Sequence, residues 1–550
     1  MQVVGFFEDR LEKENIINFR KEWDLPSKKN ETKGNEMRQQ AITLAVLALT
    51  SSLSFGANPQ ILTEPRSSIG LQTARIENLE RALNAKLIEQ FSPGLSVAVV
   101  ADGNIIFSKG FGKTQIGGSL AVTPDTPFYI ASSTKAFTAH ISSDLARSKP
   151  HSLTTPVMTT PVQMLMPTLR FHPNVNAEQV TLQSLLNHTH GISGDGPVTY
   201  RTAFTGEFQS AQDLLALLPH HLASASGNSF EYSNLGPVLA GYILEHLTGK
   251  AWQDLVDERV FKPLNMHNSA NRLTQLDPQK IAQGHEFSGD AFVVTKANKI
   301  DKNMHAAGGS YSSANDLAAW LGVHLKQGSW QGKTIFSPEL IADAWKQTAS
   351  QNRTVGGMKR VGWSLGWDIA EYKGQKIYLR PGGFTGYSAH ISMMPERGVG
   401  VVVLSNGGQL SGMMNQHIVD VIYTSLLNEA DHDARRIEAE SKLQANYAKM
   451  IQAQLAEKQK RAARQQPLPL PMANYAGTFE NELGTLECQI KGNQLILKMG
   501  IAEADTEVFK AEEHAFRTEL LGRGQILTYV MKDGKVTGLN LGEKFFAKKN

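Results

Sequence analysis

The sequence contains a single cysteine, little net charge and no long apolar segment. The one cysteine, Cys488, excludes an internal disulfide and any metal site built from several cysteines, and we expect a buried small side chain. A formal net charge of +3 over 550 residues gives no reason to expect nucleic acid as a partner. No segment beyond residue 57 is long and apolar enough to cross a bilayer, so we expect no membrane span.

What is present indicates a globular chain with an export signal set back from its start. Hydrophobic residues make up 41% and charged residues 19%, which excludes wholesale disorder, and the length predicts two or more units. Residues 1–36 mix both charge signs, and we interpret them as a spurious or disordered extension. Met37, the basic Arg38 and the apolar stretch 41–49 then predict a signal peptide at 37–57, hence a periplasmic or secreted protein. The alternative is a buried helix behind a genuine extension.

Residues 70–428 combine strand-like and helix-like segments in an order that predicts one α+β domain. Apolar runs at 95–100 and 104–107 flank the turn-forming Asp102 and Gly103, the pattern of a hairpin. Periodicity predicts helices at 73–89, 181–188, 211–219 and 235–248, and strands at 362–368, 376–379, 387–394 and 398–404. This order predicts an antiparallel sheet completed by both ends of the domain and flanked by helices.

The chain changes character after residue 428. Residues 429–471 are rich in Ala, Glu, Lys, Gln and Arg and end in prolines, which predicts a helical linker. Residues 472–550 hold alternating apolar runs on either side of two turn dipeptides, Gly492-Asn493 and Asp533-Gly534. These runs predict hairpins and a small all-β domain at the C-terminal end.

Ser132 and Lys135 form a Ser-x-x-Lys pattern at the start of an apolar helical segment. Positions i and i+3 share a helix face, so we expect the Lys135 ammonium to lie beside the Ser132 hydroxyl. The positive end of the helix dipole and the ammonium both favour an alkoxide, which makes Ser132 a candidate nucleophile. By itself the pattern also fits an N-cap serine followed by a solvated lysine.

A second pattern, Tyr232-Ser233-Asn234, follows about a hundred residues later. In an extended or turning segment Tyr232 and Asn234 point to the same side. A phenol near a lysine loses its proton more easily and can serve as a general base, while an amide can orient a substrate carbonyl. Read alone, the tripeptide also fits a buried tyrosine and a turn-forming asparagine.

Together these segments resemble the serine β-lactamase-related family, which includes class C β-lactamases, D-alanyl-D-alanine carboxypeptidases, D-aminopeptidases and esterases. Residues 128–139 resemble its nucleophile segment. Further segments match in order and spacing: 185–192, with His190 where serine is usual, 230–234, 263–266, Gly308-Gly309 with Asp316, and Gly366-Trp367. The resemblance covers roughly residues 75–427. It implies a β-lactamase/transpeptidase-like fold, with Ser132, Lys135 and Tyr232 as catalytic residues.

The chain departs from the family at the third motif, which is Lys-Thr-Gly or His-x-Gly. The corresponding residues are Arg380, Pro381 and Gly382, followed by Gly383. Arg380 keeps a cation that can hold a substrate carboxylate in a bidentate manner, or it is a salt-bridging strand residue without a ligand. The backbone N–H groups of Ser132 and Gly383 would form the oxyanion hole. We therefore predict Asn234, Arg380, Gly382 and Gly383 as substrate-binding residues.

These features predict an exported serine hydrolase that acts through an acyl-enzyme on amide, ester or lactam carbonyls. The expected partner is a small-molecule or peptide substrate, and no metal or organic cofactor is needed. The C-terminal β-domain resembles the lipocalin-like appendages of family peptidases and esterases, which favours that type. The alternatives are a true β-lactamase and, because of the altered third motif, a non-catalytic penicillin-recognising binding or sensor protein.

Overall fold

A computed structural model describes residues 79–148, 156–194, 196–355, 357–427, 431–463, 467–520 and 524–549. The predicted extension at 1–36 and the predicted signal peptide at 37–57 lie outside the described residues. Among the described residues, no helix combines the length and the apolar character that crossing a bilayer requires.

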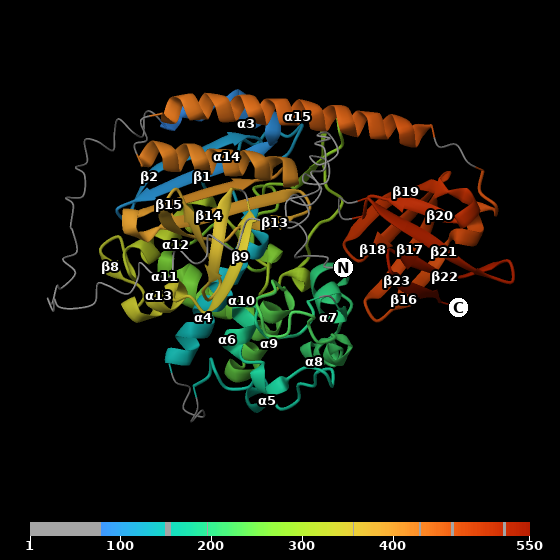
Figure 1. The fold of residues 1–550 in the computed structure, drawn as a ribbon, viewed down its shortest axis with the longest axis horizontal. Coiled ribbons are helices and arrows are strands. Elements are labelled where there is room, and N and C mark those ends of the chain that lie inside the picture. Colours follow the sequence, from blue (N-terminus) through green and yellow to red (C-terminus); the bar gives the residue numbers. More distant parts are fainter. Residues whose placement is uncertain are drawn as a thin grey trace, which may run out of the picture. The chain divides into compact units, whose positions relative to one another are not determined.

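The first part of the described chain contains an antiparallel sheet of nine strands, in the order β2-β1-β15-β14-β12-β11-β10-β9, with β13 paired to β14 (Figure 1). The strands are β1 Gly94–Ala101, β2 Asn104–Gly112, β9 Ala349–Val355, β10 Met358–Trp363, β11 Asp368–Tyr372, β12 Gln375–Leu379, β13 Gly382–Phe384, β14 Tyr387–Met394 and β15 Val399–Ser405. The predicted hairpin of β1 and β2 is confirmed. Leu95 pairs with Ser405, so both ends of the domain complete the sheet, as predicted.

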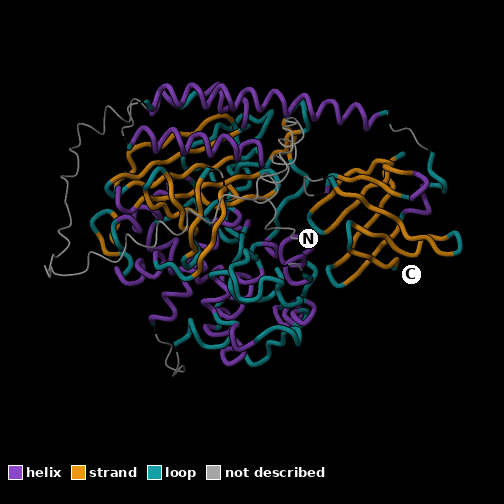
Figure 2. Tube along the Cα trace, in the orientation of Figure 1, coloured by secondary structure: helices purple, strands orange, loops and turns teal. Residues whose placement is uncertain are grey.

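The sheet is buried on both faces at its central strands β1, β14 and β15, which explains why β1 and β15 are nearly continuous apolar runs. Successive residues of β1 alternate between two hydrophobic clusters, with Val97 and Val99 in one and Ala98 and Val100 in the other. On one face lie α3 (Ala85–Phe91) and α14 (Gly408–Leu426). On the other lie α12 (Ala314–Leu325) and the larger set of helices (Figure 2).

Helices fill the stretch between β2 and β9. They are α4 Lys135–Arg147, α5 Val162–Leu165, α6 Leu182–Leu186, α7 Pro197–Tyr200, α8 Ala211–Leu215, α9 Leu235–Thr248, α10 Trp252–Val256, α11 Lys262–Leu264, α12 Ala314–Leu325 and α13 Pro338–Trp345. The predicted helix at 235–248 is confirmed with the same bounds. The predicted helices at 181–188 and 211–219 correspond to the shorter α6 and α8, whose N-caps are Thr181 and Ser210.

Two expectations are wrong in detail. The helix expected over 73–89 is broken within its described part, because Asn84 leaves the helix and its side chain caps the next one, α3. The strand expected over 362–368 is interrupted at 364–367 by a turn between β10 and β11, in which the Ser364 N–H donates to the Trp367 carbonyl at 2.9 Å. Gly366 has a φ of +83° there, which is a left-handed conformation that glycine adopts without strain.

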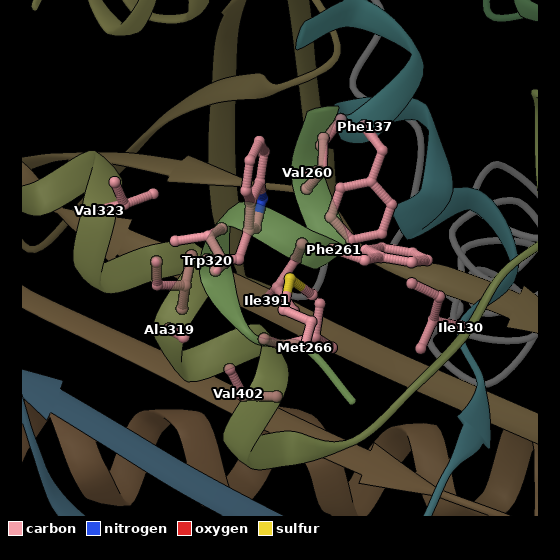
Figure 3. Close-up of a cluster of buried hydrophobic side chains, with 14 of the residues drawn as sticks. Ile130, Phe137, Val260, Phe261, Met266, Ala319, Trp320, Val323, Ile391 and Val402 are labelled. Atoms are coloured by element: carbon pink, nitrogen blue, oxygen red, sulfur yellow. The ribbon is translucent and has the colours of Figure 1, made fainter. Parts of the chain in front are cut away.

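Helix α4, which carries Lys135 at its start, is anchored in the core by aromatic contacts (Figure 3). The Phe137 ring meets Trp320 at 5.1 Å and Phe261 at 5.3 Å between centroids, both edge to face. Ile391 of β14 and Val402 of β15 belong to the same cluster. The helix that follows the candidate nucleophile therefore shares a hydrophobic core with the sheet.

Residues beyond 430 form one long helix and a closed barrel. Helix α15 spans His432–Ala462. The barrel strands are β16 Gly477–Asn481, β17 Gly484–Lys491, β18 Gln494–Met499, β19 Ala502–Lys510, β20 Ala515–Thr518, β21 Gln525–Lys532, β22 Lys535–Leu541 and β23 Lys544–Lys548. Both predicted hairpins, β17–β18 and β21–β22, are confirmed. Cys488 is buried as predicted, and burial raises the pKa of its thiol to about 11.

The barrel contacts a π-helical segment, η3 (Arg201–Thr205), within a compact unit that includes residues 75–550. The Glu207 carboxylate accepts two hydrogen bonds of 3.1 Å, from the backbone N–H and the hydroxyl of Thr485. The Ile501 N–H donates to the Phe204 carbonyl at 3.1 Å. Gly500 approaches so closely that a β-carbon there would lie 2.3 Å from the Thr205 Cα.

Candidate active site

The candidate nucleophile lies on a tight turn between the sheet and helix α4. Ala131 has a φ of +44°, a left-handed conformation that is strained for alanine, and it opens the 3₁₀ turn η1 (Ala131–Thr134). Ser132 is half-buried, while Ser133, Thr134 and Lys135 are buried. The turn therefore exposes the Ser132 hydroxyl and buries the residues that hold it.

Two hydrogen bonds fix this turn to the surrounding chain. The Ser133 hydroxyl donates to the Arg380 carbonyl oxygen at 2.8 Å, which ties the turn to the strand of the third motif. The Thr134 hydroxyl accepts from the Ser310 N–H at 3.1 Å, in the segment that contains Gly308 and Gly309. Three regions far apart in the sequence therefore meet at Ser132.

Lys135 lies beside Ser132, as the i, i+3 spacing predicts. Its ammonium nitrogen Nζ is 3.0 Å from Ser132 Oγ, 2.6 Å from Asn234 Oδ1 and 2.7 Å from the Ala307 carbonyl oxygen. The side chain is 1% exposed, so these contacts replace water. Three acceptors match the three N–H bonds of an ammonium, whereas a neutral amine has two. This arrangement can hold Lys135 as an ammonium.

Tyr232 reaches Ser132 from the loop before α9. Its phenolic oxygen donates to Ser132 Oγ at 2.8 Å. The ring packs against His188, with 4.7 Å between centroids, and against Trp363, with 5.9 Å. His188 Nδ1 accepts from the Ser233 N–H at 3.2 Å, and burial, followed by the Lys135 charge, lowers the His188 pKa well below its usual range. His188 is thus a neutral support for the tyrosine loop.

Asn234 lies in the same cluster but contacts the protein itself. Its side-chain oxygen accepts from Lys135, and only 7% of the residue is exposed. The structure thus brings Ser132, Lys135, Tyr232 and Asn234 together. The role predicted for Asn234, orienting a substrate amide, stays a prediction.

Gly382 and Gly383 lie on β13, the short strand that runs beside the nucleophile turn. Gly382 is buried, and a β-carbon there would lie 2.0 Å from the Ile130 carbonyl oxygen and 3.0 Å from the Ser133 nitrogen. Gly383 is exposed, and a β-carbon there would meet no atom within 4 Å. The first glycine allows the close approach of strand and turn, and the second faces open space. The predicted oxyanion hole is consistent with this approach and stays a prediction.

Arg380 is buried rather than directed to solvent. It is 1% exposed, and its guanidinium Nη1 lies 3.2 Å from Asp368 Oδ2. Asp368 also faces Arg360, whose Nη1 is 3.2 Å from Oδ1, and Gln351 donates to that oxygen at 2.9 Å. These contacts are the ones expected if Arg380 is a salt-bridging strand residue without a ligand. Its predicted binding of a substrate carboxylate stays a prediction.

The sequence pattern did not identify Asp368 or Trp363 as parts of the site. Asp368 begins β11, and the Arg380 guanidinium lies 4.8 Å from the centroid of the Trp363 ring. The available signal was the turn at Gly366, which marks the end of one strand and the start of the next. If the turn is not recognised, Trp363 and Asp368 fall on one predicted strand, and the sequence does not indicate which residues their side chains contact.

A second buried lysine, Lys299, lies beside Phe384 at the end of β13. Lys299 Nζ donates to the Ala203 carbonyl at 2.8 Å and lies 4.3 Å from the centroid of the Phe384 ring. Burial lowers the pKa of Lys299 to about 7. Because Phe384 follows Gly383, this lysine supports the strand that borders Ser132.

Comparison with known proteins places this site in a family. The family model described as Beta-lactamase matches residues 76–420. "Unguisins hydrolase ungD'" of Aspergillus campestris (strain IBT 28561) is 28% identical over 324 residues, which are 57% of this chain and 58% of that protein. "Protein flp" of Staphylococcus aureus (strain N315) is 25% identical over 355 residues, which are 64% of this chain and 66% of that protein. The chain spans about three fifths to two thirds of these relatives' lengths.

Solved structures share the fold. The octameric penicillin-binding protein homologue from Pyrococcus abyssi has a TM-score of 0.53 and 22% identity, over 86% of this chain and 100% of that one. D-amino acid amidase from Ochrobactrum anthropi SV3, solved with L-phenylalanine, has a TM-score of 0.53 and 22% identity, over 64% of this chain and 99% of that one. The β-lactamase/transpeptidase-like fold expected from the sequence is confirmed.

Proposed function

Because the chain belongs to the beta-lactamase family, we propose that it is a serine hydrolase whose Ser132 forms an acyl-enzyme. One observation carries the proposal: Lys135 Nζ and Tyr232 Oη lie 3.0 Å and 2.8 Å from the same oxygen, Ser132 Oγ. A serine with two proton-exchanging groups in hydrogen-bond reach is the arrangement of an activated nucleophile.

In the proposed reaction Tyr232 is the general base, and Lys135 acts as an ammonium that stabilises negative charge on the phenolate and on Ser132 Oγ. The Tyr232 phenol first loses its proton to solvent. Ser132 Oγ then bonds to the substrate carbonyl carbon while its proton passes to the Tyr232 phenolate. The proton then passes to the leaving nitrogen, oxygen or sulfur as the acyl bond breaks. Water, deprotonated in the same way, hydrolyses the ester on Ser132 and releases the acid. The N–H groups of Ser132 and Gly383 stabilise the oxyanion formed in both steps.

The favoured substrates are amides and esters of small acyl groups, so the enzyme is of peptidase or esterase type. Two observations support this: the named activity of the D-amino acid amidase that shares the fold, and the closed barrel that follows the catalytic domain. A true β-lactamase is the second hydrolytic candidate. Export, proposed from the pattern at residues 37–57, is tested by N-terminal sequencing of the mature protein.

The test is covalent labelling with a fluorophosphonate, followed by peptide mass spectrometry. Ser132→Ala should abolish the label, whereas Ser133→Ala, which removes the neighbouring hydroxyl, should keep the label on Ser132. Label that persists in Ser132→Ala would refute the nucleophile. A panel of p-nitrophenyl esters, D-Ala peptides and nitrocefin then separates the functions, because sustained turnover supports an enzyme. A burst without turnover supports the penicillin-recognising sensor suggested by the altered third motif.

A further inference from the structure

Arg380 stands where the family's third motif places a substrate-facing residue, but its charge is turned into the protein. The guanidinium is held from three sides: Asp368 lies 3.2 Å from Nη1, the Pro381 carbonyl accepts from Nε at 3.1 Å, and the Trp363 ring centroid is 4.8 Å away. With 1% of the residue exposed, a substrate carboxylate reaches it only if Asp368 is displaced. Displacing a buried carboxylate from two guanidinium groups is unfavourable.

The same guanidinium lies against the candidate general base. Its central carbon is 5.3 Å from the centroid of the Tyr232 ring, and Lys135 Nζ is 5.0 Å from that centroid. The half-buried Tyr232 ring therefore lies near two cations. Positive charge at this distance stabilises the negative charge of a phenolate, the form that accepts the Ser132 proton.

The other described side chains in contact with Tyr232, His188, Trp363 and Ser132, add no negative charge. His188, which packs on the ring from the loop after α6, is neutral because burial and the Lys135 charge lower its pKa. Trp363 is uncharged, and Ser132 is the hydrogen-bond partner. Arg353 lies further out, 5.4 Å from the centroid of the Phe230 ring. Asp368 stands behind Arg380 and holds it in place.

We infer that Arg380 is a positioning residue for Tyr232 and not a carboxylate ligand, and that the preferred acyl donors carry no carboxylate on the leaving group. The inference rests on the proposed hydrolase function and names its substrate class: neutral esters and amides. A β-lactam or a peptide with a free C-terminal carboxylate next to the scissile bond is then a poor substrate. Arg380 keeps the positive charge of the family's third motif, but this charge stabilises the Tyr232 phenolate and does not bind the substrate.

The first experiment measures the rate of Ser132 labelling by a fluorophosphonate between pH 5 and pH 10, which requires no knowledge of the substrate. Arg380→Gln should shift the rising limb of the profile upward by about one pH unit and slow labelling at pH 7 about tenfold. Arg380→Lys, which keeps the charge, should restore part of the rate. An unshifted profile in a folded Arg380→Gln variant would overturn the positioning role.

Arg360→Gln is the matched control. Arg360 is equally buried and faces the other oxygen of the same Asp368, Oδ1. Its loss should lower the melting temperature without moving the pH profile. If Arg360→Gln shifts the profile as much as Arg380→Gln does, the effect comes from general loosening of Asp368, and the assignment to Arg380 is wrong.

The second experiment compares two thioesters, benzoyl-D-alanyl thioglycolic acid and its methyl ester, which differ only in a carboxylate on the leaving group. The wild-type protein should acylate at least as fast from the methyl ester as from the acid. The substrate class would be overturned by a strong preference for the acid that is lost in Arg380→Gln or in Arg353→Gln. It would also be overturned if neither thioester acylates Ser132. Persistent label in Ser132→Ala refutes the hydrolase itself, so the two failures are distinguishable.

Discussion

Gly382→Ala and Gly383→Ala should have different effects although the two glycines are adjacent on β13. A β-carbon at Gly382 would lie 2.0 Å from the Ile130 carbonyl oxygen and 3.0 Å from the Ser133 nitrogen. Both neighbours are backbone atoms, so either the strand or the nucleophile turn has to move. An extra carbon forced into a packed interior costs about 1–3 kcal/mol. That cost lowers the melting temperature by roughly 2–12 °C in a domain of 150–250 residues and by less in a larger one.

The same displacement should impair acylation. Gly382 and the Ser132 turn are in direct contact, so a shift of about 1 Å moves the neighbouring Gly383 N–H away from the oxyanion position. Misplacement on that scale lowers rates by up to about 100-fold. Gly382→Ala is therefore expected to lose both stability and labelling rate.

Gly383→Ala should lose neither. Its β-carbon meets no atom within 4 Å, its φ lies outside the left-handed region, and its N–H is retained. The free energy of unfolding should stay within about 0.5 kcal/mol of the wild-type value. Thermal unfolding and fluorophosphonate labelling measure both quantities on the same samples. Wild-type behaviour of Gly382→Ala, or unfolding of Gly383→Ala at a much lower temperature, would refute the geometry.

Three further predictions use the same assays. Tyr232→Phe should slow Ser132 labelling about 100-fold or more with little change in melting temperature, because the general base is lost; a rate within about threefold of wild type would contradict this. Lys299, with its pKa lowered to about 7, binds fewer protons in the folded than in the unfolded state between about pH 7 and 10.5, so its contribution to stability rises with pH in that window. We therefore compare the free energies of unfolding of Lys299→Met and wild type at pH 6.5 and pH 9.5. The value for the variant minus that for wild type should be lower at pH 9.5, by up to about 4 kcal/mol. An equal difference at both pH values would refute the lowered pKa of Lys299. Gly500→Ala should speed proteolysis between the barrel and the catalytic domain. Gly492→Ala is the control, because Gly492 has a similar φ (+59° against +53°) but open space around its β-carbon, and it should not speed proteolysis. Equal proteolysis of the two variants would refute the contact with η3.

The catalytic cluster was predictable because its residues are joined by short spacings. Lys135 follows Ser132 by one helical turn, and Tyr232 and Asn234 are two residues apart, so local geometry places each pair. Their meeting across a hundred residues came from the family resemblance, since composition and periodicity contain no long-range contact. Ala131 has no sequence signal, because alanine rarely adopts a positive φ.

The Arg380 contacts were not predictable in the same way. Asp368 reaches Arg380 through the pairing of two strands, and the turn at Gly366 hid the start of β11 inside an apolar run. Periodicity distinguishes strand from loop poorly where the turn itself is buried. A β-carbon at Gly366 would lie 2.9 Å from the Lys135 carbonyl oxygen, so a turn that looks like strand in the sequence is specified by packing on α4.

The pairing of β1 with β15 has a consequence for the newly made chain. The Gly94 N–H donates to Asn406 Oδ1 at 2.7 Å across a separation of 312 positions. At about 5–20 residues per second, the first hairpin waits roughly 15–60 s for its partner strand to be synthesised. A lone two-stranded hairpin is marginally stable in water, so the early chain lacks a platform for helix α4. If Ser132 is the nucleophile proposed above, a chain truncated before β15 carries it without the sheet that supports its turn.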